Sequence, residues 1–92
     1  MKSLPAHVAV YDRTPEYTDS TVPASFLENT HTTMAGVWCR ICVSEGSLRY
    51  RILGPVPEEH RLTPDSPGVV EPEVRHEVEL IGSVRFHIEF LR

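Results

Sequence analysis

Histidine is the residue type in this chain best suited to chemistry, because its side chain titrates near neutral pH and is a common metal ligand. Five histidines occur among 92 residues. Two of them, His31 and His76, each adjoin a predicted turn at the end of a predicted strand. His76, Val78 and Leu80 alternate with Glu77 and Glu79 along the chain. The His76 imidazole is therefore predicted to lie on the apolar face of a half-buried strand. A ring there either ligates a metal or packs as a hydrogen-bonded, partly buried side chain.

Two histidines are too few to hold a metal by themselves. Zinc usually takes three or four protein ligands, and non-haem iron commonly takes two histidines and a carboxylate. The remaining histidines are predicted to face solvent in the simplest interpretation, since His7 and His87 lie on the polar side of their strands and His60 in a polar connection. The sequence does not choose among the residues that would complete the ligand set, which are Glu28, Cys39, His60 and Glu71.

The pair Cys39 and Cys42 has the spacing of a CxxC motif, but it lies inside the run with the clearest strand composition, Val37–Val43. A separation of three residues in a strand places the two thiols on opposite faces of the sheet, so we expect them neither to form a disulfide nor to share a metal. Cys39 is predicted to pack in the core or to ligate a soft metal. Cys42 is predicted to be a small residue on the outer face.

Short runs of β-type residues between prolines and glycines predict an all-β fold. Gly36 closes a predicted turn and is free to adopt a positive φ. A hairpin is predicted at Ser44–Ser47, a loop at Glu16–Pro23 and a turn at Ile81–Ser83. Strand and turn signals at this spacing are typical of a barrel or sandwich, and a chain of 92 residues makes one domain. The predicted strands are Ala6–Tyr11, Ala24–His31, Val37–Val43, Leu48–Leu53, His60–Thr63, Val69–Val70, His76–Leu80 and Val84–Leu91.

The composition excludes several classes of partner. The formal net charge is −4 and no dense run of Lys and Arg occurs, so a nucleic-acid partner is not expected. No apolar run approaches the roughly 20 residues of a membrane helix, and the first residues lack the apolar block of a secretory signal. We therefore expect a cytoplasmic protein whose two cysteines are free thiols.

Three motifs in this order resemble the small cupins of the TehB/YeaR-like tellurite-resistance family. They are Glu28 with the stretch from His31 to Trp38, the segment from Gly46 to Tyr50, and Glu71-Pro72-Glu-Val-Arg-His76; the resemblance covers residues 22–92. The chain departs from the family pattern by one extra residue between Glu28 and His31, by Arg75 where a Trp is usual, and by a short loop over residues 54–67.

The resemblance implies a double-stranded β-helix, or jelly-roll, barrel spanning residues 1–92 with a divalent metal at its open end. His31 and His76 would be ligands from the two halves of the barrel. Cys39 falls near a position where the wider cupin superfamily has a glutamate ligand, which makes it the third candidate, with Glu28 or His60 as further ones. The resemblance implies a role in stress resistance, but the family has no defined reaction.

We therefore expect a small metal-binding cupin that holds a small molecule or an anion at zinc, iron or nickel. One alternative is a metal-dependent cupin enzyme, of dioxygenase or isomerase type, with Glu28 or Tyr50 as its polar group. Another is a metal-free dimeric module, for sensing or structure, whose histidines only pack. Because so small a barrel exposes edge strands, we expect a homodimer.

Overall fold

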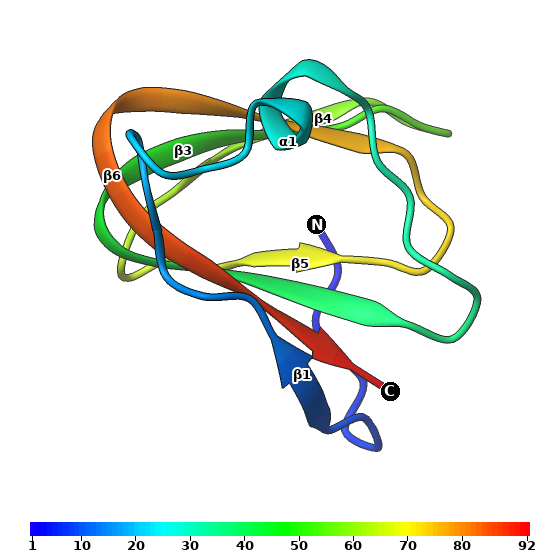
Figure 1. Ribbon diagram of the computed structural model, residues 1–92. Helices are drawn as coiled ribbons and strands as arrows, with labels where there is room; N and C mark the ends of the chain where they lie inside the picture. Colours follow the sequence, from blue (N-terminus) through cyan, green and yellow to red (C-terminus); the bar gives the residue numbers. More distant parts are fainter.

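The computed structural model describes all residues, 1–92, and consists of six strands and one short helix (Figure 1). The strands form one antiparallel sheet in the order β1-β6-β3-β4, with β2 paired to β6 and β5 paired to β3. The predicted all-β class is confirmed. β1 and β4 are open edges, so the sheet is not closed and the predicted jelly-roll barrel is not confirmed. The elements are β1 (Val10–Arg13), β2 (Tyr17–Thr18), α1 (Ala24–Glu28), β3 (Trp38–Ile52), β4 (Glu58–Leu62), β5 (Gly68–Val70) and β6 (His76–Leu91).

Two long strands, β3 and β6, pair with each other over almost their whole length. The sequence predicts that each of them is two strands separated by a turn, and this prediction is wrong. Gly46 and Gly82 do adopt the positive φ values of turns, 78° and 63°, but the chain continues in the same strand beyond them. The register shifts between Val43 and Ser47, so the turn-type residues bend the paired strands together, as the curve of β3 and β6 in Figure 1 shows.

The core lies inside this bend. The predicted alternation is confirmed along most of β3 and β6, where residues of one parity are buried and those of the other are not. It fails at the end of β6, where Glu89 and Leu91 are buried. Tyr50 and Phe86 are the largest fully buried side chains. Gly68 packs so close to Leu62 that a Cβ would lie 2.7 Å from its Cδ1. The core cluster also contains Cys39, Ile41, Val43, Leu48, Ile52, Val70, Val78, Val84 and Ile88.

The segment Ala24–His31 is predicted as a strand, but its first five residues form the helix α1. The main-chain N–H of Phe26 donates to the carbonyl of Pro23 (3.0 Å), and the Phe26 ring packs on Phe86 with a centroid distance of 5.9 Å. This tertiary contact fixes the helix, and sequence alternation does not reveal it. Helix α1 is much too short to cross a bilayer, and no other helix is present.

The amino-terminal strands also differ from the prediction. β1 lies at Val10–Arg13 rather than Ala6–Tyr11, and β2 occupies two residues of the segment Glu16–Pro23 that is predicted to be a loop. Both strands pair with β6. Their position beside β6 brings Thr14 and Tyr17 to the rim of the cavity described below.

Candidate pocket for a ligand and a metal

His31 and His76 are 45 positions apart in the sequence but form a main-chain pair. The N–H of His31 donates to the carbonyl of His76 (2.8 Å), and the N–H of His76 donates to the carbonyl of His31 (2.9 Å). Residues that exchange both hydrogen bonds in an antiparallel pair project their side chains to the same face. The two imidazole rings accordingly lie with their centroids 5.9 Å apart. His76 begins β6, and His31 comes from the segment that follows α1.

Each imidazole donates one hydrogen bond to a main-chain carbonyl. The Nε2–H of His31 donates to the carbonyl of Phe26 (2.8 Å), and the Nδ1–H of His76 donates to the carbonyl of Val74 (3.2 Å). A carbonyl oxygen only accepts, so these bonds set the tautomers and leave the Nδ1 of His31 and the Nε2 of His76 as lone-pair donors. Every buried side-chain nitrogen has a partner, so these two free nitrogens are reached by solvent.

Helix α1 holds the His31 ring in place. Phe26 provides both the carbonyl that accepts from Nε2 and an aromatic ring stacked on the imidazole, with centroids 5.3 Å apart and planes at 28°. On the other side, Tyr50 meets the ring of His76 edge-on at 6.0 Å and donates its hydroxyl hydrogen to the carbonyl of Val69 (3.0 Å). Both imidazoles are therefore fixed by aromatic neighbours from different elements.

Burial lowers the pKa of the His76 imidazole; its hydrogen bond to Val74 raises the pKa in part, and the neighbouring His31 lowers it further. The net shift is downward, because His76 is only 7% exposed. A lowered pKa keeps the ring neutral at physiological pH, and the neutral ring is the form that can ligate a metal.

The loop that carries His31 is bound to the segment that leads into β6. The hydroxyl of Thr33 donates to the carbonyls of Val37 (2.9 Å) and Glu71 (3.3 Å), and the carbonyl of Thr33 accepts from the N–H of Glu73 (3.1 Å). Together with the histidine pair, these bonds join the two segments into one wall.

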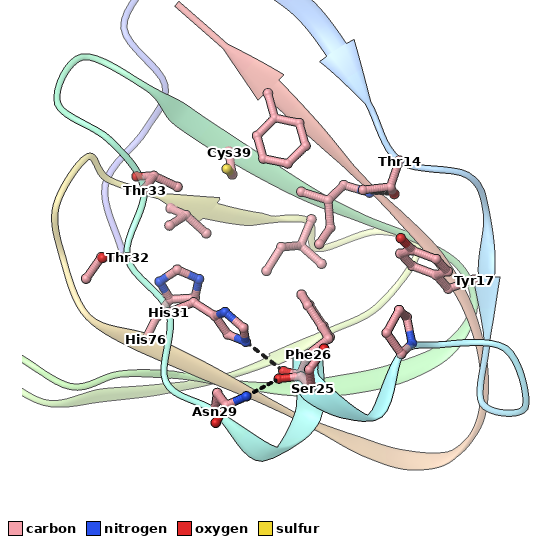
Figure 2. A pocket seen from close by; sticks show the side chains of 15 residues that line it. Thr14, Tyr17, Ser25, Phe26, Asn29, His31, Thr32, Thr33, Cys39 and His76 are labelled. Carbon is pink, nitrogen blue, oxygen red and sulfur yellow. Dashed lines mark hydrogen bonds between the residues drawn. The ribbon is translucent and has the colours of Figure 1, made fainter.

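This wall borders a cavity of about 480 Å³, which Figure 2 shows from close by. His31, His76 and Cys39 all line it. None of its fifteen lining residues is Asp, Glu, Lys or Arg, so the cavity carries no formal charge while its histidines are neutral. Hydroxyl and amide groups come from Thr14, Tyr17, Ser25, Asn29, Thr32 and Thr33, and the apolar lining from Pro23, Phe26, Ile41, Val70, Ile88 and Phe90.

Cys39 is buried, as predicted, and is a free cysteine on the opposite face of β3 from Cys42. Burial raises the pKa of the Cys39 thiol to about 11. The thiol is therefore protonated at neutral pH unless a cation binds to it. The Cys39 sulfur and the ring nitrogens of His31 and His76 do not all lie within 4.8 Å of one another.

The other predicted ligand candidates lie outside the cavity. Glu28 is exposed at the end of α1. His60 lies on β4 and pairs with the carboxylate of Glu58 (2.9 Å), and Glu71 pairs with Lys2 (3.2 Å). The structure thus brings together His31, His76 and Cys39 and separates the carboxylates from them.

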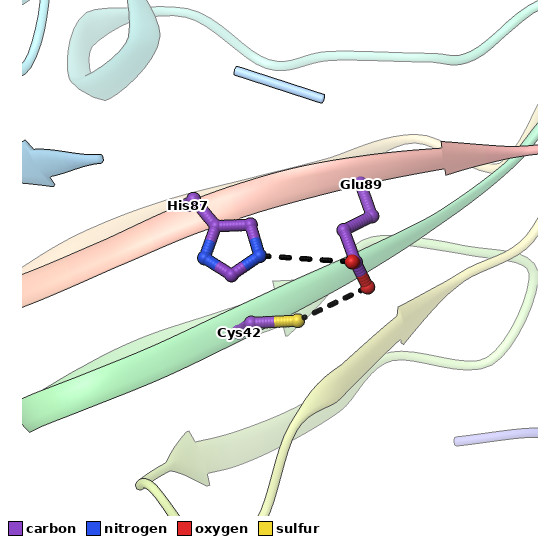
Figure 3. A group of neighbouring side chains, drawn as sticks. All are labelled: Cys42, His87 and Glu89. Atoms are coloured by element: carbon purple, nitrogen blue, oxygen red, sulfur yellow. Dashed lines mark hydrogen bonds and ion pairs between the residues drawn. The ribbon is translucent and has the colours of Figure 1, made fainter. Parts of the chain in front are cut away.

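A different set of potential ligands meets on the outer face of β3 and β6. The ligand atoms of Cys42, His87 and Glu89 all lie within 4.8 Å of one another (Figure 3). The sequence places Cys42 and His87 on an outer face but does not bring them together. Cys42 opposes His87 directly in the β3–β6 register, which pairs two strands far apart in the sequence.

Charge dominates this outer cluster. The guanidinium of Arg40 pairs with the Glu89 carboxylate at 2.6 Å, and Arg13 lies 3.6 Å from its other oxygen. Burial alone would raise the pKa of Glu89, but the hydrogen bond and charge of Arg40 outweigh it and hold that pKa below its usual value. Burial and the nearby Glu89 carboxylate raise the pKa of Cys42.

Comparison with known proteins places this architecture in a family. A family model of the TehB-like domain matches residues 12–88, and a search of curated proteins finds no match. The crystal structure of TehB from Haemophilus influenzae is similar with a TM-score of 0.81 and 30% identity, over 94% of this chain and 32% of that one. The chain therefore spans about a third of the length of that protein.

A second similar structure is a protein from E. coli (strain K12), with a TM-score of 0.83 and 23% identity over 100% of this chain and 97% of that one. At that identity the similarity shows the fold alone. The family match, by contrast, extends over most of the chain and includes both histidines and Cys39. The chain belongs to the TehB-like domain family.

Proposed function

We propose that the cavity binds a divalent metal through the Nδ1 of His31 and the Nε2 of His76, and that the metal holds a small molecule or an anion. The observation that carries this proposal is the pair of hydrogen bonds from the opposite ring nitrogens to main-chain carbonyls. Metal-ligating histidines typically donate their second ring N–H in this way, which fixes the ring and its tautomer. Both rings are thus oriented before any metal arrives.

Cys39 is the residue on this cavity that completes the set. Its thiol would have to lose its proton and move closer to the imidazoles, because the three ligand atoms are not within 4.8 Å of one another here. Two imidazoles and a thiolate suit zinc, a borderline-soft ion, and nickel is also compatible with imidazole ligands. Iron, the third metal that the sequence suggests, commonly takes a carboxylate in addition.

The charge of the cavity favours an anionic ligand. A divalent ion bound to two neutral imidazoles and one thiolate keeps a net positive charge, and no Asp or Glu side chain lines the cavity to balance it. A small anion in the remaining coordination positions supplies that balance in a mostly apolar environment of low dielectric. Hydroxyl groups such as those of Thr14 and Thr32 are available at the cavity wall to donate hydrogen bonds to it.

The broader context is consistent with a cupin that acts in tellurite resistance. The bent pair of β3 and β6 would form the main wall of an open, cupin-like barrel. Membership of the TehB-like family supports the link to tellurite. The two cysteines are free, which agrees with a reducing cytoplasm as the location.

Metal analysis of protein purified without an affinity tag tests the proposal. We expect zinc or nickel in the untreated protein, and a rise in melting temperature when zinc is returned after chelation. His31→Ala and His76→Ala should reduce that rise, whereas His7→Ala, which changes an exposed histidine outside the cavity, should leave it at its full size. A rise of equal size in all variants would refute the assignment.

Two copies of the chain are expected to pair through β1. This strand is an edge of the sheet, all four of its residues are exposed, and it carries Val10 and Tyr11 on the surface. An unpaired edge with apolar side chains is stabilised by pairing with a second copy. Light scattering should give twice the mass of 10.4 kDa and the monomer mass for Val10→Lys; a native monomer at micromolar concentration would contradict the pairing.

A further inference from the structure

The outer face of the β3–β6 pair carries a compact block of four polar side chains. In the register, Cys42 opposes His87 and Arg40 opposes Glu89. Because residues two apart in a strand share a face, these four residues project from the same side of the sheet. The cavity lies on the other side, where Cys39 and Ile41 point. The block is therefore separate from the pocket in which His31 and His76 meet.

Three of these side chains converge on one point, as Figure 3 shows. The Sγ of Cys42 donates to the Oε1 of Glu89 at 3.5 Å, and the Nε2 of His87 lies 3.8 Å from its Oε2. Glu89 is only 8% exposed, while Cys42 and His87 are half-buried and remain accessible from solvent. All three stand on strands of the central pair, so their positions are held by the sheet.

We propose that Cys42, His87 and Glu89 form a Zn²⁺ site independent of the cavity. A thiolate, an imidazole and a carboxylate are all established zinc ligands, and three protein ligands leave the fourth tetrahedral position for water. On binding, the Sγ–H bond of Cys42 breaks, its proton passes to solvent, and the sulfur forms the bond to zinc. This inference does not rest on the function proposed for the cavity.

Arg40 is the resident counter-ion of this site. Its guanidinium is bonded to the Glu89 carboxylate at 2.6 Å, so zinc must compete with it for the same oxygens. The Arg40 side chain is 36% exposed and can turn to solvent when it is displaced. Because of this competition, removing the guanidinium should strengthen zinc binding at this site, although it should lower the stability of the folded protein.

Co²⁺ is a suitable probe, because its bond to a thiolate gives an intense charge-transfer absorption. Titration of the Cys39→Ser protein isolates the outer site, since Cys42 is then the sole thiol in the chain. We expect a saturable thiolate–Co²⁺ band that zinc displaces. His87→Ala in this background should weaken binding by roughly tenfold or more, and Arg40→Gln should strengthen it by several-fold. His7→Ala should leave it unchanged.

The outcomes separate this site from the cavity. Absence of the band in folded Cys39→Ser protein, or a band insensitive to both His87→Ala and Arg40→Gln, would overturn the proposal. His31→Ala should not alter the band, because His31 lies on the cavity side. Should His87→Ala fail to fold by circular dichroism, the Arg40→Gln comparison still decides the matter, since a bystander cysteine predicts no strengthening.

Discussion

His31 and His76 exchange two main-chain hydrogen bonds, of 2.8 and 2.9 Å, and this pairing places both imidazoles on the wall of one cavity. The two segments that carry them lie far apart in the sequence and are also bound to each other by the main-chain hydrogen bond from Glu73 to Thr33 (3.1 Å). The pair therefore forms only when the chain has folded around the bend of β3 and β6. The opposite ring nitrogens are held by Phe26 and Val74, which orients the free nitrogens in advance.

The bend itself is open to a test on two glycines. A Cβ on Gly46 would lie 2.2 Å from the main-chain oxygen of Ser83, whereas nothing lies within 4 Å of a Cβ on Gly82. Both residues have positive φ, which costs a non-glycine residue about 1–3 kcal/mol. We expect Gly82→Ala to lower the free energy of unfolding by about that amount and Gly46→Ala to lower it by clearly more. Urea denaturation measures both, and equal losses would argue against the close approach.

Stability of the metal-free protein should depend on the protonation of His76. Burial lowers its folded-state pKa, so in the unfolded chain the group binds protons at a higher pH, near about 6.5. The stabilising contribution is present above this value and is lost as the pH falls through the folded-state pKa. With a chelator present, the free energy of unfolding should decrease as the pH drops below about 6.5, and His76→Gln should reduce this dependence. Identical pH profiles for both proteins would contradict the burial effect.

The two cysteines should differ in their reactivity toward iodoacetamide. Burial raises the pKa of the Cys39 thiol to about 11, which lowers its thiolate population at pH 8 by roughly a hundredfold relative to an ordinary thiol. Cys39 is also only 4% exposed, whereas Cys42 is half-buried. Peptide mapping of native protein should therefore show carboxamidomethylation of Cys42 first. Labelling of Cys39 at the rate of a free thiol would show that the cavity is more open than the structure indicates.

Much of this architecture follows from local pattern. Alternation alone assigns Cys39 to the inner face and Cys42 to the outer face, and it places His76 among buried residues. These assignments succeed because side-chain direction in a strand depends only on parity. The all-β class follows in the same way from short apolar runs and frequent turn residues.

What the sequence does not reveal depends on contacts between distant segments. A glycine with positive φ fits a tight turn and a bulge equally well, and only the pairing of β3 with β6 shows that Gly46 bends a strand. The helix α1 forms because Phe26 packs on Phe86, and this wrongly assigned element is the one that holds His31. The Cys42–His87 contact likewise depends on a register that local patterns do not encode.

The separation of the carboxylates from the two histidines, which the sequence does not predict, has a related cause. The segment that carries Glu28 is helical rather than extended, and Glu28 is exposed at the end of the helix. The cavity is consequently neutral, and this neutrality is the reason to expect an anion beside a bound metal. Substituting Asn29, which lines the cavity, with Asp should therefore strengthen zinc binding and weaken binding of the anion that the zinc holds, as calorimetry with zinc and then with the anion would show.

The most direct test is NMR of the imidazole nitrogens during a zinc titration of isotope-labelled protein. Before zinc is added, His31 should be the Nε2–H tautomer and His76 the Nδ1–H tautomer. With zinc, the resonances of the His31 Nδ1 and the His76 Nε2 should shift together and saturate together, while those of His7 stay in place. Zinc saturation that leaves both nitrogens unchanged would contradict the metal site in the cavity.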